Sequence, residues 1–164
     1  MTEPGGSAHP DGPVANGPVV WREPVQPAWI DYNGHLSEPY YVLVMGHATD
    51  AVMDHVGLDP DHRERTGTSL FTVEAHVRYL DQVLAGAQLE VRSTVVGSSA
   101  KLLRIWHELW ADGTLRATEE ILGVHVDTGT GKSSPFPPEV AERIAGALVA
   151  PPPEAGAGIS VRSG

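Results

Sequence analysis

The segment from Asp31 to Glu38 gathers residue types that can hydrolyse an acyl compound. It holds a carboxylate at Asp31, an amide at Asn33, a flexible Gly34 and an imidazole at His35, and it ends at Glu38. A carboxylate held in a tight loop can activate water or attack a carbonyl carbon itself. Pro39 then indicates a helix start, where free backbone N–H groups can bind an oxyanion. The alternative is that Asp31 and Asn33 are ordinary turn residues.

Three further polar side chains could extend such a site. His35 fits a general acid, a hydrogen-bond donor that braces the loop, or a surface residue. Glu74 and His76 belong to an alternating polar row with Thr72 and Arg78. This row is either a solvated sheet face or part of the active site, in the same or a facing subunit. No third ligand stands at suitable spacing, so neither a metal site nor another cofactor is predicted.

Hydrophobic periodicity predicts the elements that must hold these residues. Strands are expected over residues 19–25, 69–80, 88–96, 101–110 and 115–126, with a last helix over 138–148. The main helix is capped by Ser37 or Glu38, ends at Gly57 and carries Tyr41 on its apolar face. Within 69–80, alternation places Phe71, Val73, Ala75, Val77 and Tyr79 on one face. One helix and one sheet can bury each other's apolar faces, which predicts an α+β fold.

Length and composition limit the function further. The 164 residues suit one domain, expected over 19–149, between disordered arms at 1–18 and 150–164 that are rich in Gly, Pro and Ala. A signal peptide, cysteine and a membrane-length apolar run are all absent from the sequence, so a cytoplasmic protein that does not enter membranes is expected. The formal net charge of −10 argues against a nucleic-acid partner.

The run of residues 29–41, WIDYNGHLSEPYY, resembles the catalytic loop of the 4-hydroxybenzoyl-CoA thioesterase-like family. That loop has an Asp, two residues, a Gly and often a His before a helix that carries a Tyr, as in Asp31, Gly34, His35 and Tyr41. The resemblance extends over about residues 19–144 and includes Gly86 and the Asp112–Gly113 hairpin. Many members have Asn-Asn where this chain has Ser37-Glu38.

The resemblance implies a hot-dog fold, in which an antiparallel sheet wraps a long helix, and an acyl-CoA thioesterase activity. It implies that Asp31 is the central catalytic residue, with the backbone N–H of Glu38 as oxyanion donor and those of Gly34 or His35 assisting. The family hairpin matched by Ser98, Ser99 and Lys101 often contacts the CoA pyrophosphate; otherwise it is a solvated turn. The family also builds active sites between subunits, so a homodimer or homotetramer is expected.

A closer resemblance is to betainyl-CoA thioesterases of carnitine breakdown, on residues 29–35, 46–51 and 72–78. It implies hydrolysis of betainyl-CoA to glycine betaine and CoA. A trimethylammonium group favours aromatic faces and a nearby carboxylate. The candidate faces are Trp29, Tyr32, Tyr40, Tyr41 and Trp106, and the candidate carboxylates are Glu38, Glu74 and Asp50. Alternatively the aromatics are core residues, and the substrate is a short-chain or aromatic acyl-CoA. A non-catalytic acyl-CoA-binding module and a hydratase are the competing classes.

Overall fold

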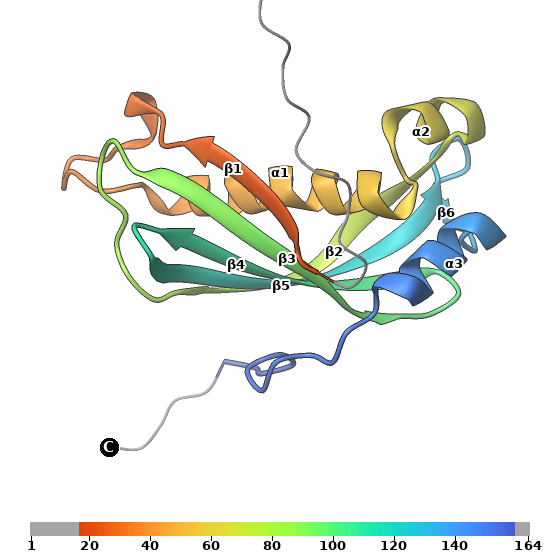
Figure 1. Ribbon diagram of the computed structural model, residues 1–164. Coiled ribbons are helices and arrows are strands. Elements are labelled where there is room, and N and C mark those ends of the chain that lie inside the picture. Colours follow the sequence, from red (N-terminus) through yellow and green to blue (C-terminus); the bar gives the residue numbers. More distant parts are fainter. Residues whose placement is uncertain (1–16, 160–164) are drawn as a thin grey trace, which may run out of the picture.

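The computed structural model describes residues 17–159, in which a curled antiparallel sheet wraps one long helix (Figure 1). The helix is α1 (Glu38–Val56), and the sheet has the spatial order β1-β3-β4-β5-β2. The strands are β1 (Val19–Pro24), β2 (Thr68–Tyr79), β3 (Gln88–Ser98), β4 (Leu102–Ala111), β5 (Thr114–Asp127) and the short β6 (Lys132–Ser133), which pairs with β5. A 3-10 turn, η1 (Pro27–Trp29), and helices α2 (Pro60–Thr66) and α3 (Pro138–Ala147) complete the chain. This arrangement confirms the predicted hot-dog fold.

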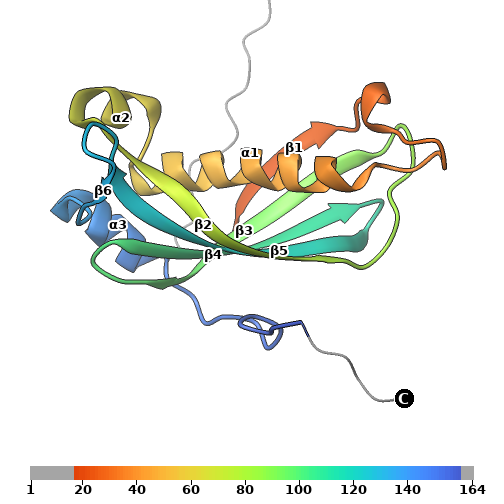
Figure 2. The same ribbon diagram turned by 180° about the vertical axis from the view of Figure 1, so that it is seen from behind.

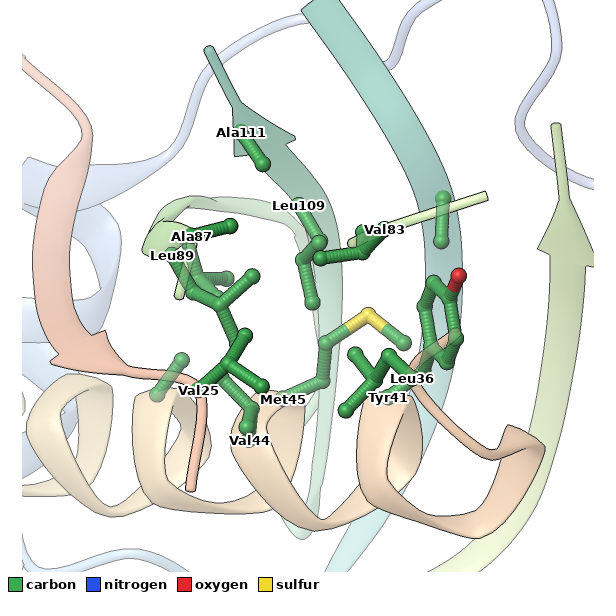
Figure 3. Packing of buried hydrophobic residues seen from close by; sticks show 13 residues of the cluster. Val25, Leu36, Tyr41, Val44, Met45, Val83, Ala87, Leu89, Leu109 and Ala111 are labelled. Carbon is green, nitrogen blue, oxygen red and sulfur yellow. The ribbon is translucent and has the colours of Figure 1, made fainter. Parts of the chain in front are cut away.

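The helix α1 is held by the apolar stripe that the sequence predicts. Figure 3 shows Tyr41, Val44 and Met45 beside Leu89 and Leu109 of the sheet, and all five are buried. Their burial is the main force that fixes the helix on the sheet. The helix ends at Gly57, whose φ of 92° is the left-handed conformation that glycine adopts without strain. None of the helices in residues 17–159 is long and apolar enough to cross a bilayer.

Strand β2 departs from the predicted alternation. Its register with β5 shifts between Thr72 and Glu74, which leaves Val73 in a bulge. A bulge adds one residue to one strand and so reverses the facing of the side chains beyond it. The prediction of one shared face is therefore wrong: Val77 and Tyr79 face α1, whereas Phe71 pairs with Val124 on the outer face. The same shift separates Thr72 from Glu74, His76 and Arg78.

The segment after α3 follows the outer face of the sheet, on the side away from α1 (Figures 1 and 2). The backbone N–H of Gly156 donates to Glu120 Oε2 at 2.6 Å, and Arg104 Nε donates to Glu120 Oε1 at 2.6 Å. The predicted disorder of residues 1–16 and 160–164 lies outside the described residues. The domain limits of 19–149 stay a prediction, which truncation after Val149 would test.

Gly123 lies where β5 meets the side chain of Leu70. A Cβ atom there would lie 2.7 Å from Leu70 Cγ and 2.8 Å from Cδ2. We expect Gly123→Ala to lower the free energy of unfolding by roughly 1–3 kcal/mol, because the packed core must shift. Urea denaturation measures this change. The control is Gly146→Ala on α3, where such a Cβ has no described atom within 4 Å, and it should not destabilise. Equal stability of Gly123→Ala and the unaltered protein would contradict this close packing.

Candidate active site

Asp31 lies in a turn that the backbone of its own loop closes. Its N–H donates to the His35 carbonyl at 2.9 Å, and the Gly34 N–H donates to the Asp31 carbonyl at 3.0 Å. Gly34 has a φ of 79°, so the tight turn uses the freedom of glycine. His35 also bridges to Leu84, which ties the loop to the segment before β3. The local sequence therefore builds a fixed support for Asp31.

The Asp31 carboxylate is oriented by the same backbone. Its Oδ1 accepts the N–H of Asn33 at 2.8 Å and the N–H of His35 at 3.3 Å. Within residues 17–159, Oδ2 has no hydrogen-bond donor. A carboxylate held by one oxygen and free at the other suits a base or a nucleophile. The N–H groups of Gly34 and His35 both bond to Asp31 in this structure, so their predicted assistance to the oxyanion would require these bonds to open, and it stays a prediction.

The first turn of α1 leaves the N–H group of Glu38 open beside this loop. Ser37, the N-cap, donates its N–H to the Trp29 carbonyl at 2.9 Å, and the Tyr40 N–H donates to the Ser37 carbonyl at 3.1 Å. Pro39 has no N–H. Among the residues that the structure describes, the N–H of Glu38 has no acceptor. It lies at the positive end of the helix dipole, which suits an oxyanion donor. This role of Glu38 remains a prediction.

Asp31 opens onto a groove of about 490 Å³. The groove is lined by Asp31, His35, Leu36, Glu38, Tyr41, Tyr79, Leu80, Asp81 and Gln82. Tyr41 and Tyr79 meet edge to face with ring centroids 5.3 Å apart, and the Tyr41 hydroxyl donates to the Asp81 carbonyl at 3.3 Å. Burial raises the pKa of Tyr41, so its phenol stays neutral near pH 7. The structure thus brings Asp31, His35, Glu38 and Tyr41 together.

The predicted aromatic and polar residues of the loop tip lie outside this groove. Tyr32 is 97% exposed, and Asn33 contributes its backbone N–H rather than its exposed side chain. Trp29 stacks on Tyr40 at 5.4 Å, and neither ring lines the groove. Their sequence proximity to Asp31 therefore does not make them walls of the acyl site within one protomer.

Glu74 and His76 occupy a second hollow, of about 410 Å³, on the outer face of the sheet. They line it with Arg104 and Glu120, whereas the Asp31 groove lies on the face that carries α1. Trp106 pairs with Glu120 in register and lies on that outer face too. Asp50 is exposed on α1 and does not line the groove. Within one protomer these residues do not meet Asp31.

The hairpin that holds Ser98, Ser99 and Lys101 lies at the opposite end of β3 from the Asp31 loop. β3 has 11 residues, and a strand of that length spans roughly 35 Å. The Ser99 hydroxyl oxygen accepts the N–H of Leu102 at 3.2 Å, and Lys101 Nζ donates to Ser133 Oγ at 3.2 Å. A CoA contact at this hairpin would therefore require a second subunit.

One buried carboxyl group on the inner face was not predicted. Glu119 on β5 is 3% exposed, and burial raises its pKa to about 7. The signal was present in the sequence, since the inward positions of this strand include Ala117, Glu119 and Ile121. In residues 17–159 no three His, Asp or Glu side chains gather closely enough to hold a metal ion.

Comparison with known proteins agrees with this geometry. Residues 25–144, which contain the Asp31 loop, α1 and β2 to β5, match the family model of the thioesterase-like superfamily. The chain belongs to this superfamily. Its membership confirms the predicted class of enzyme, a thioester hydrolase.

Two curated thioesterases are similar to this chain in sequence. The betainyl-CoA thioesterase of Pseudomonas aeruginosa is 43% identical over 129 residues, which cover 77% of this chain and 80% of that protein. The L-carnitine dehydrogenase/betainyl-CoA thioesterase of Agrobacterium fabrum is 44% identical over 115 residues. That match covers 70% of this chain but 24% of the longer protein.

Two solved structures share the fold of this thioesterase. A hypothetical protein of Staphylococcus aureus, solved in complex with CoA, has a TM-score of 0.82 and 23% identity, covering 93% of this chain and 100% of that chain. A candidate thioesterase of Pseudomonas putida has a TM-score of 0.76 and 33% identity, covering 89% of this chain and 98% of that chain.

Proposed function

We propose that this thioesterase hydrolyses betainyl-CoA to glycine betaine and CoA, in the cytoplasm. The observation that carries the proposal is the oriented Asp31 carboxylate at a groove walled by Tyr41 and Tyr79. The 43% identity to the Pseudomonas aeruginosa betainyl-CoA thioesterase supports the choice of acyl group. Aromatic walls suit a trimethylammonium group, because the faces of aromatic rings attract cations.

The chemistry follows from two groups of the site, the Asp31 carboxylate and the Glu38 N–H. With Asp31 as base, its free Oδ2 takes a proton from water while the water oxygen attacks the thioester carbon. The N–H of Glu38 stabilises the oxyanion, and collapse breaks the C–S bond. The leaving thiolate then takes up the proton. With Asp31 as nucleophile, Oδ2 attacks the carbon directly, the C–S bond breaks and the CoA thiolate leaves, and water then hydrolyses the resulting anhydride to the acid and the free Asp31 carboxylate.

A CoA-release assay with two isosteric thioesters tests the acyl group. Betainyl-CoA carries a quaternary nitrogen where 3,3-dimethylbutyryl-CoA carries carbon. We expect kcat/KM to favour the cation by roughly five- to thirty-fold, the scale of a desolvated cation–aromatic contact. Each value is first corrected for the uncatalysed hydrolysis rate, because the cation activates its own thioester.

Variants locate the source of that preference. Tyr41→Leu and Tyr79→Leu should erode it, whereas Tyr40→Leu, outside the groove, should not. Equal corrected kcat/KM values for the two thioesters in the unaltered protein would contradict betainyl-CoA as substrate and favour a short-chain or aromatic acyl-CoA. No CoA release from any thioester would favour the non-catalytic binding module.

We also propose that the working unit is a homodimer or a dimer of such dimers, joined along β2. This 12-residue strand forms one edge of the sheet, and an uncovered strand edge is open to pairing. Several apolar side chains are exposed along this edge. They are Phe71, Val73 and Tyr79 of β2, Leu80 directly after it, and Val42 and Leu43 of α1. Tyr79 and Leu80 also line the groove, so a second copy on this edge would help to close it.

A further inference from the structure

A row of polar side chains crosses the inner face of the sheet beneath α1. Glu119 of β5 pairs in register with His107 of β4, which pairs with Ser93 of β3. His107 Nδ1 lies 2.7 Å from Ser93 Oγ, and its Nε2 lies 3.0 Å from Thr49 Oγ1 of α1. Thr49 donates its hydroxyl to the Met45 carbonyl, so Nε2 of His107 carries the proton and Nδ1 accepts from Ser93. Both ring nitrogens are therefore in use.

Glu119 alone in this row has no partner. Within residues 17–159 no hydrogen bond or ion pair reaches its carboxyl group, although the residue is 3% exposed. His107 cannot supply a charge, since complete burial lowers its pKa to about 3. An unpaired buried carboxyl is costly, and an apolar side chain would serve the core better. The described side-chain atoms that are fully enclosed without a partner are His62 Nε2 and His125 Nε2, so the Glu119 oxygens keep some exposure through which a ligand can reach them.

Glu119 lies next to the wall of the groove. Its register partner on β2 is Val77, and Tyr79, two residues further on, lies on the same face and lines the groove. The charge of Glu119 helps to raise the pKa of Tyr79, after burial and Glu38. Tyr79 therefore lies both at the groove and within the electrostatic reach of Glu119, although Glu119 itself does not line the groove in one protomer.

We propose that Glu119 is the counter-ion for a quaternary ammonium carried by the acyl group, which would reach it past Tyr79 at the wall of the groove. This inference rests on the proposed function and names the residue that selects the cation. The neighbours of Glu119 on the inner face are its register partners, the neutral His107 of β4 and the apolar Val77 of β2, together with the neutral Tyr79 of β2. None of these offers a positive charge, so the ligand supplies it.

The assignment makes cation binding depend on pH in a defined direction. With a pKa near 7, Glu119 is largely protonated at pH 6 and largely ionised at pH 8. Affinity for a cationic ligand should therefore rise over this interval, and binding should release a proton from part of the population. A ligand of the same shape without charge should show neither effect.

Two non-hydrolysable thioethers of CoA separate this role from turnover. One carries a 2-(trimethylammonio)ethyl group on sulfur and the other a 3,3-dimethylbutyl group. Calorimetry at pH 6, pH 7 and pH 8, in buffers of different ionisation enthalpy, measures affinity and proton release together. We expect the unaltered protein to bind the cation up to about tenfold more tightly at pH 8 than at pH 6, with about half a proton released at pH 7.

Glu119→Gln keeps the shape and removes the charge, so it should abolish both the preference and the proton release while it still binds the neutral thioether. It should also melt at a higher temperature at pH 8. Glu119 has a pKa near 7 in the folded protein, above the ordinary value of 4.5 that it regains on unfolding. It therefore lowers the stability of the folded protein as pH rises from 4.5 to 7. The matched control is Glu120→Gln, the next residue, which faces the outer hollow and should keep the preference.

The outcomes separate the two proposals. A cation preference and proton release that survive in Glu119→Gln would overturn the role of Glu119 and leave the betainyl-CoA activity standing. A preference lost in Glu119→Gln, in a protein that does not turn over betainyl-CoA, would support the counter-ion and contradict the proposed reaction. The absence of any preference in the unaltered protein would overturn the inference, even where neutral thioesters are hydrolysed.

Discussion

Asp31→Asn is expected to lower kcat by roughly 10²-fold or more, the scale of a lost catalytic base. Asparagine keeps an oxygen that can accept the N–H groups of Asn33 and His35, which now bond to Oδ1 at 2.8 and 3.3 Å. The loop should therefore keep its shape, and the melting temperature should change little. Loss of activity would then report on the charge and not on the fold. CoA release and thermal unfolding measure the two effects.

Asp81→Asn is the matched control, because Asp81 lines the same groove but its carboxylate pairs with Arg116 at 2.7 Å. Its kcat should fall less than about tenfold, since it has no part in proton transfer. An Asp31→Asn variant with nearly unchanged kcat would remove Asp31 from the mechanism. A large fall for both variants would show that the charge of the groove, rather than one carboxylate, matters.

Val73→Glu is expected to split the proposed dimer and lower kcat/KM by roughly 10²-fold. Val73 is 59% exposed in the bulge of edge strand β2, so the protomer should fold with the new side chain. Two such strands in one interface would bring like charges together and leave the groove open at Tyr79 and Leu80. A displacement of the reacting groups by about 1 Å lowers the catalytic rate on this scale. Light scattering and CoA release measure mass and activity on the same sample.

The same substitution on the other edge of the sheet provides the comparison. Val20 lies on β1 and is 38% exposed, so Val20→Glu adds an equal charge away from the proposed interface. It should leave mass and activity nearly unchanged. A Val73→Glu protein that is monomeric and fully active would show that the site is complete in one chain. A Val73→Glu protein that is still dimeric would show that the interface does not lie along β2.

The order and type of the long elements followed from the sequence. Alternation in 88–96, 101–110 and 115–126, and the i, i+3, i+4 stripe of α1, are local patterns that burial reinforces. The elements α2 and β6 were missed because 7 and 2 residues are too short to show a period. The bulge at Val73 was missed because it arises from pairing with β5, which alternation along one strand does not reveal.

Within the candidate site, the sequence by itself determined what is contiguous. Asp31, Gly34, His35 and Glu38 lie in one turn and one helix start, so their spacing alone implied a carboxylate beside open N–H groups. Which of those N–H groups stay open depends on the hydrogen bonds of the folded loop, and these leave Glu38 rather than His35. Tertiary structure alone decided that Tyr79 lines the groove, that Glu74 and His76 lie on the other face, and that within residues 17–159 no hydrogen bond or ion pair reaches the Glu119 carboxyl group. These facts depend on strand register and bulge position, which move a side chain from one face of a sheet to the other with a shift of a single residue.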